Sequence, residues 1–127
     1  MADALKPISC YVSPAGNDKI AEWYGGLSEQ GRADADVFIE NMRKKSEWKM
    51  PDYRPKLTGY KKLGELRWTS EKVEQRLIGY LKGGTFHAVM GCTHKGKVYD
   101  PTNALDQADK RKDQIEAGIA RTVPYDL

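Results

Sequence analysis

Two arginines are the first residues of this chain that could do chemistry on a phosphate group. Arg67 ends the run Glu-Leu-Arg and Arg76 begins the run Arg-Leu-Ile, so each lies on its own predicted strand, next to the other. The planar guanidinium group can form two hydrogen bonds with one phosphate. We therefore expect these arginines to stabilise the transition state of a phosphodiester cleavage. The alternative is structural, since strand arginines often form ion pairs across a sheet, here with Glu65, Glu71 or Glu74.

Proton-transfer groups and cations follow the last predicted strand. Cleavage of RNA without a metal ion needs a base for the 2′-hydroxyl proton, cations for the phosphorane, and an acid for the leaving oxygen. His94 has a suitable ordinary pKa, and Tyr99 could serve if a neighbouring cation lowers its pKa, so both stay open. An exposed polar loop is the alternative. The predicted catalytic residues are Arg67, Arg76, His94, Lys95 and Tyr99, with no metal or other cofactor.

A basic segment between residues 43 and 62 precedes these strands, and Glu47 and Asp52 are its only acidic residues. The whole chain has a net charge of only +3, so this uneven distribution carries the signal for a polyanionic partner. Tyr53 and Tyr60 are interleaved with the lysines and could stack on a base. Solvated lysines with packing tyrosines are the alternative. The predicted RNA-binding residues are Lys56, Lys61, Lys62 and Lys97.

The totals indicate one domain, because 127 residues match the usual domain size of roughly 100–150 residues. Cys10 and Cys92 are far apart in the chain and form no Cys-x-x-Cys pair, which predicts buried free thiols. The stretch from Met1 to Pro7 has neither a basic head nor an apolar run, and no apolar stretch is long enough to cross a membrane. We therefore expect a cytoplasmic protein with no membrane partner.

The first half of the chain predicts a strand and two helices. Residues 8–13 favour a strand, and the flanking prolines suggest that it lies at a sheet edge. Asn17 is expected to cap a helix with apolar residues at helical spacing, and Gly31 is expected to end it. Residues 35–44 form a second amphipathic segment, which completes a helical hairpin.

The second half changes to the alternating pattern of strands. Residues 65–69, 76–81 and 85–93 predict three antiparallel strands, with a hairpin turn at Lys82-Gly83-Gly84. Asp100-Pro101 is expected to open a final helix with an apolar stripe formed by Leu105, Ala108, Ile115 and Ile119. The order β, α, α, β, β, β, α predicts an α+β domain with helices packed against one antiparallel sheet.

The run from Leu57 to Arg111 resembles the central and C-terminal block of the RelE/ParE toxin superfamily, most closely its HigB branch and related phage proteins. The motifs that carry the resemblance are Leu57-Thr58-Gly59, Glu65-Leu66-Arg67, Arg76-Leu77-Ile78, Gly91 to Lys95, and Pro101, Leu105, Ala108 and Arg111. The chain departs from the family pattern at Gln75, where tyrosine is common. It also departs between His94 and Pro101, where the family often has a Lys-Lys-Thr-x-x-Thr-Pro run.

The resemblance implies a single RelE-like domain over residues 1–127 and a function as the toxin of a toxin–antitoxin pair. That toxin would cleave messenger RNA on the ribosome without a metal ion and would thereby inhibit translation. Its partners would be a cognate antitoxin and ribosome-bound messenger RNA. Two alternatives remain: a ParE-like inhibitor of DNA gyrase, and a phage-derived module that binds nucleic acid or protein without catalysis.

Overall fold

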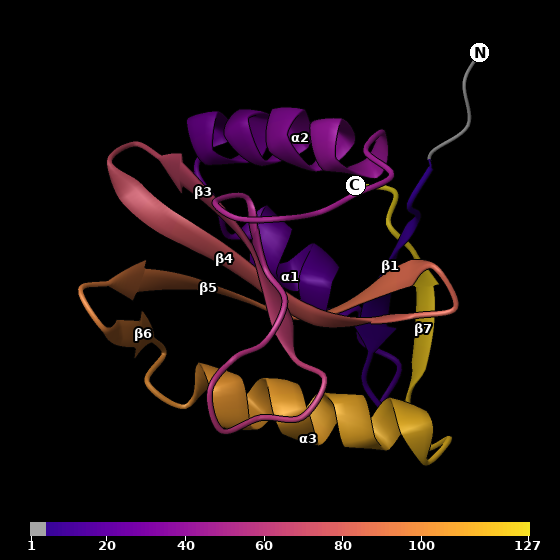
Figure 1. Ribbon diagram of the computed structural model, residues 1–127. Helices are drawn as coiled ribbons and strands as arrows, with labels where there is room; N and C mark the ends of the chain where they lie inside the picture. The colour runs from indigo at the N-terminus through magenta and orange to yellow at the C-terminus, as the bar shows by residue number, and fades with distance from the viewer. Residues whose placement is uncertain (1–4) are drawn as a thin grey trace.

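A mixed sheet lies between two helical layers in the computed structural model, which describes residues 5–127 (Figure 1). Helices α1 and α2 cover one face of the sheet, and α3 covers the other. The described residues form one α+β domain with these elements in order: β1 (Ile8–Val12), α1 (Lys19–Gly25), α2 (Glu29–Arg43), β2 (Tyr53–Arg54), β3 (Gly64–Ser70), β4 (Val73–Lys82), β5 (Thr85–Lys95), β6 (Val98–Asp100), α3 (Ala104–Glu116) and β7 (Arg121–Pro124).

The sheet has the strand order β2-β3-β4-β5-β1-β7, and β6 pairs with the far end of β5. The predicted antiparallel meander of β3, β4 and β5 is confirmed, with the β4–β5 turn at Gly83 and Gly84. The prediction of a purely antiparallel sheet was wrong, because β1 runs parallel to β5. Between β1 and β5 the chain passes through both helices and three further strands. This long connection allows β1 and β5 to run in the same direction.

The flanking prolines had suggested that β1 lies at the sheet edge. This prediction was also wrong, because β1 lies between β5 and β7. Pro7 and Pro14 both lie outside Ile8–Val12, so the strand itself contains no residue that lacks a backbone N–H. Its second side pairs with β7, a strand formed by the last residues of the chain. Strand β7 is only four residues long and ends in proline, so its sequence shows no alternating apolar pattern from which a strand could be predicted.

The starts of the first two helices differ from prediction by a few residues. Asp18, rather than Asn17, caps α1, and its Oδ1 accepts hydrogen bonds from the backbone N–H groups of Ile20 and Ala21 at 3.0 and 2.9 Å. Gly31 does not end a helix; it lies in the first turn of α2. There its N–H donates to the Ser28 cap, and an added Cβ would lie 3.2 Å from Ser28 Oγ.

The last helix begins at Ala104 rather than at Asp100-Pro101. Asp100 is instead the last residue of β6, where it pairs with Thr93. Helix α3 ends at Glu116, so Ile119 lies beyond it and is 61% exposed instead of completing the apolar stripe. The buried positions of α3 are Ala104, Ala108 and Lys112, four residues apart.

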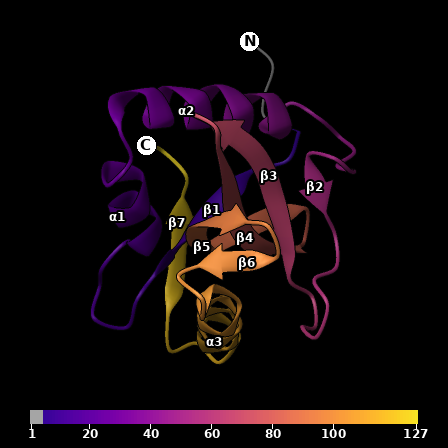
Figure 2. The ribbon, with the colours of Figure 1, turned by 90° about the vertical axis from the view of Figure 1, so that its left-hand side faces the viewer.

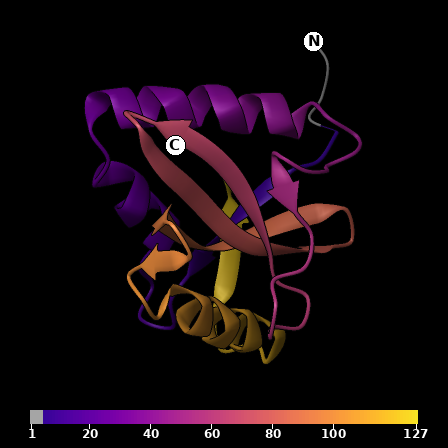
Figure 3. The ribbon, with the colours of Figure 1, turned by 60° about the vertical axis from the view of Figure 1, so that its left-hand side comes forward.

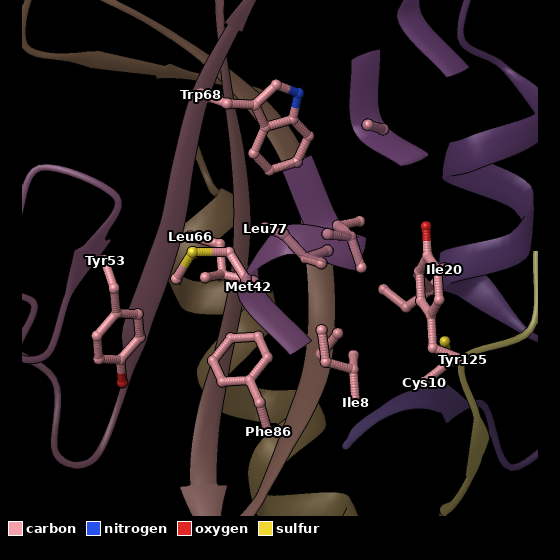
Figure 4. Packing of buried hydrophobic residues seen from close by; sticks show 13 residues of the cluster. Ile8, Cys10, Ile20, Met42, Tyr53, Leu66, Trp68, Leu77, Phe86 and Tyr125 are labelled. Atoms are coloured by element: carbon pink, nitrogen blue, oxygen red, sulfur yellow. The ribbon is translucent and has the colours of Figure 1, made fainter. Parts of the chain in front are cut away.

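Apolar cores fill both faces of the sheet. On the α1 and α2 face, Leu66, Leu77 and Phe86 of the sheet cluster with Ile20 and Met42 of the helices (Figure 4). On the other face, side chains of β4 and β5 pack against Ala104 and Ala108 of α3. These strand residues include Ile78 and Tyr80 of β4 and Met90 and Cys92 of β5. Cys10 and Cys92 are free and buried, as predicted.

No helix within residues 5–127 combines the length and the apolar character needed to cross a membrane. The expectation drawn from the start of the chain rests partly on residues 1–4, which lie outside the described residues.

Candidate functional site

The five predicted catalytic residues lie on neighbouring strands of the sheet. Arg67 on β3 pairs in register with Arg76 on β4, and His94 on β5 pairs with Tyr99 on β6. Glu74, two residues before Arg76, pairs in register with His94. Residues in register across a sheet, or two apart along a strand, point to the same face. The sheet therefore brings Arg67, Arg76, His94 and Tyr99 to its α3 face. Figures 2 and 3 show the β5–β6 hairpin close to α3 on this face.

Both arginines share one buried carboxylate. Glu65 is 1% exposed, and its Oε2 lies 3.4 Å from Arg67 Nε and 3.5 Å from Arg76 Nε. The cross-strand ion pairing weighed as the structural alternative is therefore present, with Glu65 at its centre. Such a buried carboxylate fixes two guanidinium groups that would otherwise repel each other.

The two arginines differ in how far solvent can reach them. Arg76 is 2% exposed, its Nη1 donates to the Gln75 carbonyl at 2.9 Å, and its Nη2 lies 3.4 Å from Glu74 Oε1. The Arg67 side chain is 25% exposed, and its Nη1 contacts Met50 Sδ at 3.5 Å. Arg67 also lines an open pocket of about 270 Å³ together with Arg76 and Glu74. A ligand can therefore reach Arg67, while Arg76 is engaged by protein groups.

Tyr99 keeps its proton in this environment. Its hydroxyl donates to Glu65 Oε1 at 2.5 Å. Burial raises the pKa of Tyr99 above the ordinary value of 10, the hydrogen bond to Glu65 raises it further, and the opposing effect of Arg76 is smaller. The condition under which Tyr99 could act as a base, a pKa lowered by a neighbouring cation, is not met. Tyr99 instead fixes the buried carboxylate.

His94 is the proton-transfer residue with access to solvent. Its side chain is 17% exposed and its Nδ1 lies 3.8 Å from Glu74 Oε2, close enough for an ion pair when the ring is protonated. The ring also meets Tyr99 edge to face, with 4.7 Å between centroids. At 3.8 Å the two groups are not hydrogen-bonded, and among the described residues His94 Nδ1 has no hydrogen-bond partner. Glu74 can therefore form an ion pair with a protonated His94, but it does not fix the tautomer of the neutral ring.

A pocket of about 350 Å³ opens beside His94 and Tyr99. Lys97, a predicted RNA-binding residue, lines it, and Arg54 lines it too. Arg54 was missed as a site residue because a strand of two residues, Tyr53–Arg54, leaves no period in the sequence. Its register opposite Glu65 places it on the same face as the arginine pair. Its only signal in the sequence was membership of the basic segment.

The other predicted RNA-binding lysines lie outside this pocket. Lys56, Lys61 and Lys62 are exposed, as is the predicted catalytic residue Lys95. The loop between β2 and β3, which carries Lys61 and Lys62, is hydrogen-bonded to α3, because Lys112 Nζ donates to the Lys61 carbonyl at 3.2 Å. The interleaved tyrosines pack instead of standing free: Tyr53 is buried in the core, and the Tyr60 hydroxyl donates to Asp106.

No protein-family model, curated protein or solved structure matches this chain. Within residues 5–127, no three side chains of His, Cys, Asp or Glu gather as a metal ion would require. The groups that this face offers for chemistry are an imidazole 3.8 Å from a carboxylate, an accessible arginine, and one lysine, Lys97, at the pocket rim.

Proposed function

We propose that this chain is a metal-independent endoribonuclease, the toxin of a toxin–antitoxin pair, which cleaves messenger RNA on the ribosome. The observation that supports this most is the placement of the Glu74–His94 pair on the same sheet face as Arg67, between two open pockets. The two pockets together supply a proton-transfer group, His94, and a phosphate-binding cation, Arg67, and Glu74 joins them because it lines the Arg67 pocket and lies 3.8 Å from His94. A cognate antitoxin that covered this face would inhibit the enzyme.

In the proposed reaction the ribose 2′-oxygen attacks the adjacent phosphorus and the bond to the 5′-oxygen breaks. His94 takes the 2′-hydroxyl proton, with Glu74 stabilising the imidazolium that forms. Arg67 donates to the phosphate oxygens as their charge increases. Lys97 at the pocket rim protonates the leaving oxygen. The products are a 2′,3′-cyclic phosphate and a 5′-hydroxyl end, so the atoms balance without an added reactant.

Arg76 and Glu65 act on this reaction through Arg67. They are almost fully buried and hold the Arg67 guanidinium group against the sheet. Arg76 therefore serves as a positioning residue, which revises the direct phosphate contact expected for it.

The test is cleavage of a messenger RNA by the purified chain in the presence of translating ribosomes, with new RNA ends mapped by primer extension. His94→Gln should lower the cleavage rate by about 100-fold or more, the typical contribution of a general base. His87→Gln, on the same strand, is the matched control and should cleave like the wild type. The absence of new ends with the wild-type chain would refute the nuclease.

A second candidate, a binding module without catalysis, is favoured by one observation: the guanidinium group of Arg76 is occupied by Glu65, Glu74 and a backbone carbonyl. In that case RNA binding would occur without new ends, and growth arrest would be unchanged in Arg67→Ala. A DNA supercoiling assay run in parallel would detect the gyrase inhibition known for ParE-type proteins.

A further inference from the structure

We propose that the pocket between β2 and β6 binds one unpaired nucleobase of the RNA, so that the enzyme selects single-stranded substrate. The inference rests on the proposed function and specifies its substrate. The pocket has a volume of about 350 Å³, within the range of roughly 300–1,000 Å³ common for sites that enclose small molecules. It adjoins His94, so a base held there would place its own nucleotide next to the proton-transfer group.

Apolar and aromatic side chains form part of the pocket wall. Leu57 and Leu105 come from the loop before β3 and from the first turn of α3, and Tyr99 comes from β6. The Tyr99 hydroxyl donates a hydrogen bond to Glu65, and the Tyr99 ring contacts the His94 ring edge to face. These two contacts fix the orientation of the Tyr99 ring. A fixed aromatic ring beside aliphatic groups suits the flat face of a base of any identity.

The polar part of the wall consists of donors rather than carboxylates. Arg54 and Lys97 carry positive charge, Thr58 offers a hydroxyl group, and among the described residues no Asp or Glu lines this pocket. Cations at the rim suit the phosphates that flank a base, and they disfavour a cationic ligand. The combination of an apolar wall and a cationic rim matches a nucleotide.

Base pairing would prevent this binding. In a duplex each base is stacked on both faces and paired along one edge, and it must leave the stack before it can enter a protein pocket. A single strand requires no such step. The pocket therefore explains selection of unpaired RNA without any contact that recognises a base sequence.

The test uses a 2′-O-methylated RNA hexamer, which lacks the attacking hydroxyl and so reports binding alone, measured by fluorescence anisotropy. A series of hexamers in which one base at a time is removed should show one position where the loss weakens binding between about 5- and 150-fold, the range for one stacked base. Annealing the hexamer to its complement should weaken binding at least as much. Equal effects at every position, or equally tight duplex binding, would overturn the proposal.

Two variants link the effect to this pocket. Leu105→Trp fills the pocket and should remove the position-dependent effect. Arg54→Ala should weaken hexamer binding, whereas Arg121→Ala on β7 should not, although each removes one exposed arginine from a short edge strand. Arg54 is exposed, so this comparison holds even if Leu105→Trp fails to fold. Equal weakening by Arg54→Ala and Arg121→Ala would also overturn the proposal.

The base pocket and the nuclease can fail separately. Position-dependent binding without cleavage of unmodified RNA would refute the nuclease and leave the base pocket standing. Cleavage without position-dependent binding would refute the base pocket and leave the nuclease standing.

Discussion

Arg67 and Arg76 lie opposite each other on β3 and β4, and both approach the same carboxylate oxygen of Glu65. The repulsion between the two positive charges is offset by Glu65, which is almost fully buried as Arg76 is, and Glu74 adds a second carboxylate beside Arg76. The stability of the domain and the geometry of the candidate site therefore depend on one buried glutamate.

Glu65→Gln should destabilise the domain strongly, because it keeps the shape of the side chain but leaves two guanidinium groups without their shared anion. Removing one partner of a buried ion pair typically costs about 3–5 kcal/mol. Urea unfolding at neutral pH measures the loss. Glu74→Gln is the control: this side chain is half exposed, so its loss should cost about 1 kcal/mol or less. Similar losses for both variants would contradict a central role for Glu65.

The two arginines should separate stability from activity. Arg67→Ala removes a partly exposed side chain and leaves Glu65 paired with Arg76, so it should lower the free energy of unfolding less than Arg76→Ala does, while lowering cleavage by about 100-fold. Arg76→Ala removes a buried one and should cost about 3 kcal/mol or more. Urea unfolding and primer extension on the same preparations test this split. Equal destabilisation by the two substitutions would contradict it.

The meeting of Arg67 with Arg76 could be predicted from the sequence, because alternating residues on both sides of a short turn predict a hairpin. Residues 71 and 72 make this turn with positive φ although neither is glycine, so its register could not be predicted. His94 and Tyr99 were grouped by their closeness in the chain, and their facing registers on β5 and β6 confirm that grouping.

Other parts of the site depend on contacts between distant segments. Arg54 reaches the pocket only because β2 pairs with β3, and the parallel pairing of β1 with β5 joins segments more than seventy residues apart in the chain. Such pairings leave no local period in the sequence. The burial of Arg76 likewise depends on the packing around Glu65, so the sequence suggested the residue but could not show that solvent is excluded from it.

Buried tyrosines should make the domain sensitive to alkali. Burial raises the pKa of Tyr80 from 10 to about 12, and that of Tyr99 also rises. The native state therefore keeps protons that the unfolded chain loses above pH 10, so stability is fully present below pH 10 and falls as pH rises above it. Each such tyrosine contributes a slope of about 1.4 kcal/mol per pH unit. Urea unfolding between pH 8 and 11 measures the fall, and Tyr80→Phe should reduce it. A flat profile would contradict this linkage.

Two glycines should respond to alanine in opposite ways. A Cβ at Gly91 on β5 would lie 2.3 Å from the Trp23 indole, so Gly91→Ala must displace α1 from the sheet and should cost about 1–3 kcal/mol, as overpacking does. At Gly25 in α1 a Cβ would meet no atom within 4 Å. Gly25→Ala should therefore stabilise the domain by up to about 1 kcal/mol, because alanine favours helix. Thermal unfolding of both variants checks the signs, and a stabilised Gly91→Ala protein would show that α1 does not pack on β5 through Trp23.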